Sequence, residues 1–279
     1  MAGISVVILS FNSREHVKRC LDSLVKQQHE DVEVVVVDNG SKDGTPDFIK
    51  FNYPKARLIL NEKNLGAAKA RNQGIEAVSG KWILTLDCDV VLEDGFIKKI
   101  VGFANSLEDS IGMIQPKILS QDDKKIYSAG IRISFLKRFH DIAKGMTDVE
   151  KFNIPVPVYG ACCAAALYRR KMLEEAKDNY GYFDERLFFL FEDADLSWRA
   201  QKKGWICRYY PVAKCYHYGN SSFTDKKSRQ FLSFRNRQLM ILKNQNLLVT
   251  LLMIPLYLVY DLPRFLILAF KFKCRFPKI

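Results

Sequence analysis

Four short apolar runs, each followed by polar residues, constrain the fold of this chain more than any other feature. They cover residues 5–9, 32–37, 57–60 and 82–86. Helical patterns separate them, as in residues 17–25, where apolar side chains recur at helical spacing. Strands that alternate with helices in this way favour right-handed βαβ units. The pattern predicts an α/β protein with a Rossmann-like, mostly parallel central sheet flanked by helices.

The polar residues that end these runs are expected to meet at one edge of the sheet. Ser10, Asp38, Asn61 and Asp87 stand at the carboxyl ends of the strands, where parallel α/β sheets bind ligands. The chain has no Gly-x-Gly-x-x-Gly after the first strand and no Gly-Lys-Ser/Thr, so neither a dinucleotide fingerprint nor a P-loop is indicated. A nucleotide held by side chains remains compatible, with Arg71 reaching a base or phosphate. The structural alternatives are a turn-forming Asp38 and a solvated Arg71.

Two carboxylates one residue apart, Asp87 and Asp89, follow the fourth apolar run. Alternation in an extended segment would send both side chains the same way. Carboxylate oxygens are hard ligands suited to Mg²⁺ or Mn²⁺, which are often shared with substrate phosphates. The alternative is a turn in which an aspartate caps the next segment.

A second acidic cluster, Glu192, Asp193 and Asp195, follows the apolar run 187–191. One carboxylate at a helix start is explained by capping, which leaves the others unexplained. An acid in apolar surroundings has its pKa raised toward that of a general base. The two clusters together predict group transfer from a nucleotide-linked donor, in which Asp89 holds the metal and Glu192 or Asp193 takes a proton from the acceptor.

Residues 121–153 show weak periodicity and mixed charge. We interpret them as a long excursion that covers the site or binds the second substrate. The small residues that follow, around Gly160, predict either close packing or close approach of a ligand to the backbone.

The cysteines and the start of the chain bear on the compartment. Seven cysteines without a Cys-x-x-Cys pair indicate neither a zinc site nor a disulfide framework, which favours a reducing compartment. Residues 1–10 lack the basic region of a secretory signal.

The basic character is concentrated in the last part of the chain. The formal charge is +12, and residues 224–279 hold eleven Lys or Arg against two Asp, which is +9. This part is apolar from Leu247 to Tyr260, but Pro255, Asp261 and Pro263 interrupt it. A spanning helix needs about 20 unbroken apolar residues, so we expect amphipathic helices on an anionic membrane surface rather than a transmembrane span. Packing on the enzyme or on a second copy in a homo-oligomer is the alternative.

From Ser5 to about Lys243 the chain resembles the family 2 glycosyltransferases of the GT-A fold, in particular their bacterial rhamnosyltransferase-type members. The motifs that carry the resemblance are Ser10-Phe11-Asn12, Val37 to Thr45, Asn61 to Gly66, Ala70-Arg71-Asn72, Asp87-Cys88-Asp89, Phe183-Asp184-Glu185, Glu192 to Leu196, Tyr210-Pro211, His217 and Arg235-Asn236-Arg237. One departure is the first loop, where many members have an aromatic residue before the asparagine and an earlier proline.

We expect a GT-A domain, as the resemblance implies, over residues 1–223, followed by basic and apolar C-terminal helices over residues 224–279, where the charge is concentrated. The resemblance implies inverting transfer from a nucleoside-diphosphate sugar with Mg²⁺ or Mn²⁺. The donor would be deoxythymidine-diphosphate rhamnose, with UDP-sugars next. If the tail lies on a membrane surface, the acceptor is expected to be a lipid-linked or cell-surface glycan. We then expect a cytoplasmic enzyme, peripheral on the cytoplasmic face of the membrane.

The resemblance also assigns roles to residues. Asp38 and Arg71 would hold the nucleobase, Asp87 the ribose or sugar, and Asp89 the metal, with Asp193 the catalytic base beside Glu192. The other positions expected to contact the nucleotide sugar are Ser10, Asn12, Asn64 and Gly160.

Three further side chains carry alternatives. His217 would touch the diphosphate or complete the metal shell, or is a structural histidine. Arg235 and Arg237 contact a phosphorylated acceptor or lipid headgroups, or are solvated helix charges, which is the default.

Two rival functions were weighed. A nucleotidyltransferase would carry a glycine-rich basic loop after the first strand, and residues 10–14 contain no glycine. A non-catalytic basic protein that binds membrane or nucleic acid leaves the carboxylates unexplained, and we expect no nucleic-acid partner.

Overall fold

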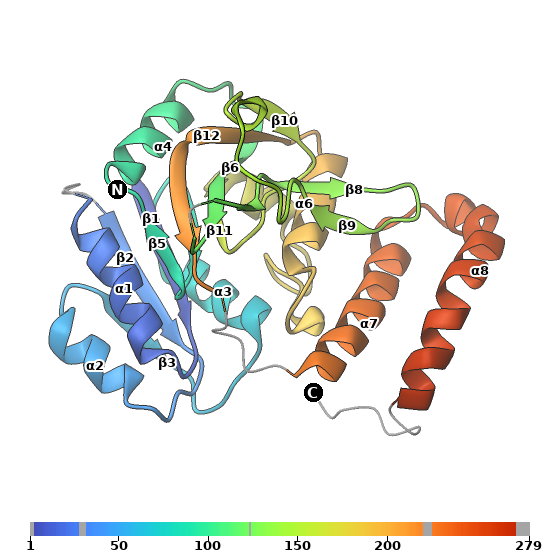
Figure 1. Ribbon diagram of the computed structural model, residues 1–279, viewed down its shortest axis with the longest axis horizontal. Helices are drawn as coiled ribbons and strands as arrows, with labels where there is room; N and C mark the ends of the chain where they lie inside the picture. The colour runs from blue at the N-terminus through green and yellow to red at the C-terminus, as the bar shows by residue number, and fades with distance from the viewer. Residues whose placement is uncertain (1–2, 28–31, 123, 220–224, 272–279) are drawn as a thin grey trace.

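The computed structural model describes residues 3–27, 32–122, 124–219 and 225–271. A ten-stranded sheet lies at its centre, with strand order β10-β12-β6-β11-β4-β1-β2-β3, while β5 pairs with β12 and β7 with β6 (Figure 1). The predicted parallel half comprises β1 (Ile4–Ser10), β2 (Val32–Asp38), β3 (Arg57–Leu60) and β4 (Trp82–Asp87). The central sheet of the predicted α/β fold is therefore confirmed in this half.

The other half of the sheet is mixed rather than parallel. β11 (Ala165–Arg169) runs antiparallel to β4 and β6 (Ile111–Ser120), and β6 is parallel to the long β12 (Ile206–His217). The short strands β5 (Val90–Leu92), β7 (Ile126–Ser128) and β10 (Val156–Val158) complete it. β12 was not predicted, because it has no continuous apolar run: charged residues and Pro211 interrupt it, and buried residues alternate with half-buried ones along it.

Helices cover both faces of the sheet. The core on one face joins α1 (Arg14–Val25), α2 (Thr45–Asn52) and α4 (Phe96–Asn105) to Ile4, Val6 and Ile8 of β1. The other face takes Val7 of β1 and packs against α3 (Ala67–Glu76), α5 (Arg170–Ala176) and α6 (Glu192–Lys202). β1 therefore buries residues on both faces, as is typical of a strand inside a parallel sheet.

The excursion 121–153 forms a second, two-stranded sheet of β8 (Ile131–Ile133) and β9 (Phe139–Asp141), followed by the 3₁₀ turn η1 (Glu150–Phe152). Lys117 of β6, fully buried, donates to Asp148 and Asn153 and ties the end of the excursion to the main sheet. A second 3₁₀ turn, η2 (Glu185–Leu187), precedes α6.

Two helices end the described chain. α7 (Lys226–Asn244) packs on the α/β body of the chain, since Asn244 and Lys243 bond Asp195 of α6. α8 (Leu247–Lys271) packs on α7 as an outer helix (Figure 1). At least α7 therefore packs on the rest of the chain, which was the alternative to a tail that lies entirely on a membrane.

The predicted break in the apolar segment is wrong. α8 continues through Pro255 and Pro263 for 25 residues, and its Asp261 is neutralised by Arg237 of α7 at 2.6 Å. Large apolar side chains are exposed along α8 from Leu247 to Phe270, and the expected placement of this helix on a membrane surface stays a prediction. Residues 247–270, with a hydropathy of 1.7, are long and apolar enough to cross a membrane by length and composition alone.

Candidate active site

A cavity of about 910 Å³ opens at the carboxyl ends of β1 and β4. Both acidic clusters line it, Asp87 and Asp89 from one side and Glu192 and Asp193 from α6. The excursion 121–153 contributes seven further lining residues, so the prediction that it covers the site is confirmed.

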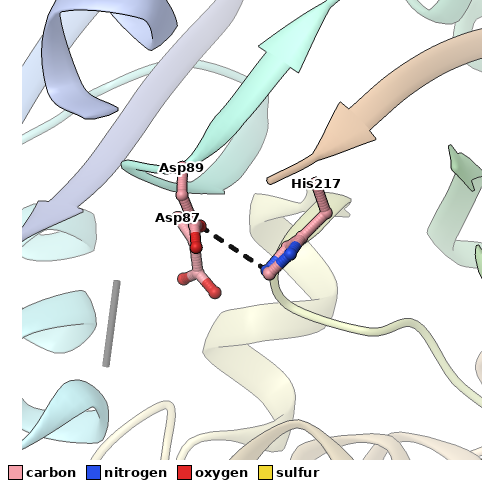
Figure 2. A group of neighbouring side chains, drawn as sticks. All are labelled: Asp87, Asp89 and His217. Carbon is pink, nitrogen blue, oxygen red and sulfur yellow. Dashed lines mark ion pairs between the residues drawn. The ribbon is translucent and has the colours of Figure 1, made fainter. Parts of the chain in front are cut away.

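Asp87, Asp89 and His217 converge on one point of this cavity. Each offers a ligand atom, and these atoms lie within 4.8 Å of one another. Figure 2 shows the three side chains, with an ion pair drawn between Asp89 and His217. The topology explains the meeting, because β5 pairs with β12 in a register that sets His217 opposite Val90, one residue after Asp89.

The donor set fits a divalent cation. Both carboxylate oxygens of Asp89 are buried, and neither accepts a hydrogen bond from a described residue; the Nδ1 atom of His217 is also buried and unpaired. The Nε2 atom of His217 lies 3.5 Å from Asp89 Oδ1, which is too long for an ordinary hydrogen bond. Burying a carboxylate without partners is costly, and carboxylate oxygens with an imidazole are ligands that Mn²⁺ or Mg²⁺ accepts.

Tyr127 of the excursion holds the histidine in place. Its ring stacks on that of His217, with centroids 4.1 Å apart and an interplanar angle of 10°. The Tyr127 ring also contacts Lys144, whose Nζ atom lies 4.4 Å from the ring centroid. Sequence reasoning missed Tyr127, because only the fold of the excursion brings it to the cluster.

Arg71 joins the two acidic clusters. Its guanidinium bonds Asp87 at 2.5 Å and Glu192 at 2.7 Å, and the residue is buried. The solvated alternative for Arg71 is therefore wrong. The charge of Arg71 is used by two carboxylates of this chain, and its predicted contact with the nucleobase stays a prediction.

Glu192 and Asp193 have different surroundings. Glu192 is buried in its ion pair with Arg71, whereas Asp193 is partly exposed to the cavity and accepts a hydrogen bond from the backbone N–H of Cys163 at 3.2 Å. Burial and the neighbouring charge of Glu192 raise the pKa of Asp193 to about 7. A carboxylate with this pKa is suited to accept a proton near neutral pH.

The loop before these acids is strained. Phe188, Leu190 and Phe191 all have positive φ, between 62° and 71°, which costs a non-glycine residue about 1 kcal/mol or more. The side-chain amide of Asn236 in α7 compensates by donating to the carbonyls of Leu187, Phe189 and Leu190. Through these bonds α7 fixes the loop that leads into α6, and so the position of Asp193 in the first turn of α6.

The two arginines that flank Asn236, Arg235 and Arg237, also have partners within the protein. Arg235 donates to the carbonyls of Arg186 and Leu187, and Arg237 is buried and bonded to Asp261. The default interpretation of both as solvated helix charges is wrong, because each satisfies groups on a packed element.

Three of the predicted donor-binding residues, Ser10, Asn12 and Asp38, lie at the ends of β1 and β2 and are not among the residues that line the cavity. Asp38 is buried and accepts from the backbone N–H and the hydroxyl of Ser41. Burial nevertheless raises its pKa. Ser10 lies opposite Asp38 in the sheet, and its buried hydroxyl has no partner among the described residues. Asn12 accepts from Lys42 N–H, which fixes the first loop on the second.

Asn64 and Gly160 differ in their relation to the cavity. Asn64 lines it and accepts from Asn39 and from the backbone N–H of Gly66. Gly160 is not among the lining residues, and a Cβ there would lie 2.1 Å from the hydroxyl of Ser197 in α6. The close approach at Gly160 is therefore to a helix, as the packing alternative held, and its contact with the donor stays a prediction.

The fold and the site define a glycosyltransferase of the GT-A class. The chain belongs to glycosyl transferase family 2, whose model matches residues 5–176. This membership removes the nucleotidyltransferase and the non-catalytic protein as rivals.

Relatives and solved structures agree with this class. The N-acetylglucosaminyl-diphospho-decaprenol L-rhamnosyltransferase of Mycobacterium tuberculosis is 28% identical over 240 residues, which is 77% of this chain and 76% of the relative. The succinoglycan biosynthesis protein ExoO of Rhizobium meliloti is 32% identical over 124 residues, 44% of this chain and 36% of that protein.

Two solved structures share the fold. The mannosyltransferase PcManGT from Pyrobaculum calidifontis, in complex with GDP-Man and Mn²⁺, has a TM-score of 0.59 at 16% identity, covering 86% of this chain and 63% of that one. S. aureus TarS has a TM-score of 0.60 at 19% identity, covering 87% of this chain, which spans 40% of the TarS chain.

Proposed function

We propose that this protein transfers a sugar, with inversion, from a nucleoside-diphosphate sugar to a hydroxyl of a lipid-linked or cell-surface glycan. The observation that carries the proposal is one cavity that holds two sets of groups. At one side Asp89 and His217 offer buried atoms without a hydrogen-bond partner among the described residues, and at the other side lies Asp193, whose pKa is raised to about 7. A rhamnose donor is favoured by the similarity to a rhamnosyltransferase.

The donor is assigned to the side of the cavity that joins β1, β2 and β4. Asp89 and His217 would hold Mn²⁺ or Mg²⁺, and the bound ion would neutralise the charge that develops on the departing diphosphate. Asp87, on the same cavity wall, is placed to accept from a sugar or ribose hydroxyl. Arg71, Asp38, Ser10 and the loop residues Asn12 and Asn64 would form the base and ribose end.

Asp193 is assigned as the general base. Its carboxylate accepts the proton of the acceptor hydroxyl while that oxygen bonds to the anomeric carbon and the bond from this carbon to the diphosphate oxygen breaks. Glu192 holds Arg71, and Arg71 holds Asp87. One buried guanidinium therefore ties the donor-binding carboxylate to Glu192, the residue next to the proposed base.

Membrane association is assigned to α8. Pairing of Asp261 with Arg237 and Gln238 on α7 leaves an outer surface rich in exposed leucine, isoleucine, valine and phenylalanine. Because α7 packs on the catalytic body, a crossing α8 would draw that body into the bilayer. An α8 that lies within the interface of the cytoplasmic leaflet avoids this cost.

The test is a thermal-shift panel of deoxythymidine-diphosphate rhamnose, UDP-sugars and GDP-sugars, each with Mn²⁺ or with EDTA. We expect stabilisation by one donor class that disappears with EDTA, amounting to about 2.7 kcal/mol at a donor concentration of 100 Kd. Asp89→Ala should abolish it, whereas Asp94→Ala, an exposed neighbour outside the cavity, should keep it. Stabilisation that survives EDTA would refute the metal assignment, and no stabilisation by any donor would refute the donor assignment.

A further inference from the structure

A second cavity, of about 730 Å³, lies between α7 and α8. Lys226, Arg229, Gln230 and Ser233 of α7 line one wall, and their spacing of three and four residues puts them on one helix face. The facing wall comes from α8 and consists of Arg264, Ile267 and Leu268.

Among the described residues, contacts between the two helices close the space on the side of the cavity that is nearer their junction. Phe234 and Phe265 contact with ring centroids 6.0 Å apart, Arg237 bonds Asp261 and Tyr257 bonds Gln245. The cavity lies toward the start of α7 and the end of α8, where the ribbons of the two helices diverge (Figure 1).

The composition of the walls selects an anionic, partly apolar ligand. Lys226, Arg229 and Arg264 are cationic, and no carboxylate is among the described residues that line the cavity. A hydroxyl and an amide, from Ser233 and Gln230, add hydrogen-bonding capacity. This set suits a phosphate or diphosphate, while the apolar residues of α8 suit an attached hydrocarbon chain.

This cavity adjoins the active site. Leu190 and Arg229 line both cavities, and the guanidinium of Arg229 lies 5.8 Å from the ring centroid of Phe189, in the loop that precedes the proposed base. A ligand held here by its phosphate can therefore extend one end toward Asp193 and the other along the apolar surface of α8.

We propose that the cavity between α7 and α8 binds the phosphate-bearing head of a lipid-linked acceptor, with the hydrocarbon chain along α8 and the sugar directed into the active site. The inference rests on the proposed function, since it supplies the acceptor for that reaction. The donor diphosphate is assigned to the Asp89 side of the other cavity, so the two anions have separate sites. The volume lies within the range of about 300–1,000 Å³ typical of ligand pockets.

The test measures binding of geranylgeranyl diphosphate to the full chain by fluorescence titration. The variant K226Q/R264Q removes two cations of the cavity outside the active site. The control K227Q/K203Q removes the same charge from exposed positions that line neither cavity. We expect the first variant to weaken binding by about tenfold or more and the control to bind like the parent protein.

Three further arms separate the ligand chemistries. Geranylgeraniol, which lacks the phosphates, and inorganic diphosphate, which lacks the chain, should each bind much more weakly than the complete lipid. Phosphatidylglycerol vesicles should bind the parent protein and K226Q/R264Q alike, because α8 supplies that contact. Two outcomes would overturn the proposal in favour of a general anionic-lipid surface. One is an equal loss of affinity for geranylgeranyl diphosphate in the control variant, and the other is a loss of vesicle binding in K226Q/R264Q alone.

Failure of this inference is distinguishable from failure of the proposed function. Donor stabilisation with Mn²⁺, measured on the same preparations, should be unchanged in K226Q/R264Q. Donor binding without selective binding of the diphosphate lipid would sink the acceptor site alone. Selective lipid binding without any donor binding would sink the proposed transfer reaction and leave the lipid-phosphate site standing.

Discussion

The raised pKa of Asp193 makes a prediction that links activity to stability. Its pKa is about 7 in the folded chain, against an ordinary value of 3.8. This difference corresponds to a cost of about 4 kcal/mol for the ionised form in the folded state. Because the folded pKa is raised, the folded state binds more protons between pH 4 and pH 7. The free energy of unfolding should therefore fall as the pH rises through this window.

Asp193→Asn removes the ionisation and the proposed base together. We expect transfer to fall by about 10²–10⁴-fold, with donor affinity in Mn²⁺ nearly unchanged. At pH 8 the free energy of unfolding of this variant, measured by denaturant titration, should exceed that of the parent by up to about 4 kcal/mol. The difference should shrink toward pH 4. Asp94→Asn, at an exposed position, serves as the matched control and should alter neither quantity.

The pH profile supplies a second, independent measurement. In the parent protein kcat/KM should lose tenfold per unit below pH 7 and reach a plateau above it. Glu192→Gln removes the charge that, after burial, raises the pKa of Asp193 most, so the acid limb should move to lower pH. Loss of donor affinity in Asp193→Asn with normal turnover of bound donor would refute the base assignment. A stability difference independent of pH would refute the raised pKa.

Three further predictions concern the surroundings of the base. Arg71→Met should lower the free energy of unfolding by about 3 kcal/mol or more, since it leaves buried carboxylates unpaired; urea unfolding measures this, and no loss would contradict the ion-pair geometry. Asn236→Ala should lower kcat more than donor affinity, and an unchanged kcat would show that the strained loop holds itself. Although burial opposes it, hydrogen bonds from Arg186 and Lys243 lower the pKa of Asp184 to about 2, so the stability that Asp184 contributes should be lost between pH 4 and pH 2, and Lys243→Met should reduce this loss.

The parallel half of the sheet was predictable mainly because β1 and β4 are buried on both faces. Each such strand is a continuous apolar run, and its polar ending marks the ligand edge. β12 escaped prediction, because its side chains alternate in exposure and it contains Pro211. His217 could be named from the resemblance, but its meeting with Asp89 depends on the pairing of β12 with β5, which no local pattern encodes.

The charges show a different limit of sequence reasoning. The acidic clusters were recognised because carboxylates at the ends of apolar runs have no use in a core. The arginines were misjudged, since a guanidinium on a helix is solvated unless a partner lies opposite. For Arg71 and Arg237 the partners are 16 to 121 residues away in sequence. Likewise, the charge that predicted an interruption of α8 at Asp261 is cancelled by a residue of another helix.

Helix α7 connects the features that the proposed reaction needs. Two consecutive residues of α7 make these connections. Asn236 bonds the strained loop that precedes Asp193, and Arg237 bonds Asp261 and so fixes α8. The spacing between the apolar surface and the proposed base is thus set by one rigid element rather than by a flexible linker. An acceptor that is held by a lipid would meet the base at a constant depth. Reacting groups must be held within about half an ångström of their productive positions, which a helix achieves better than a flexible linker. This gives a physical reason for a packed α7 between the active site and α8.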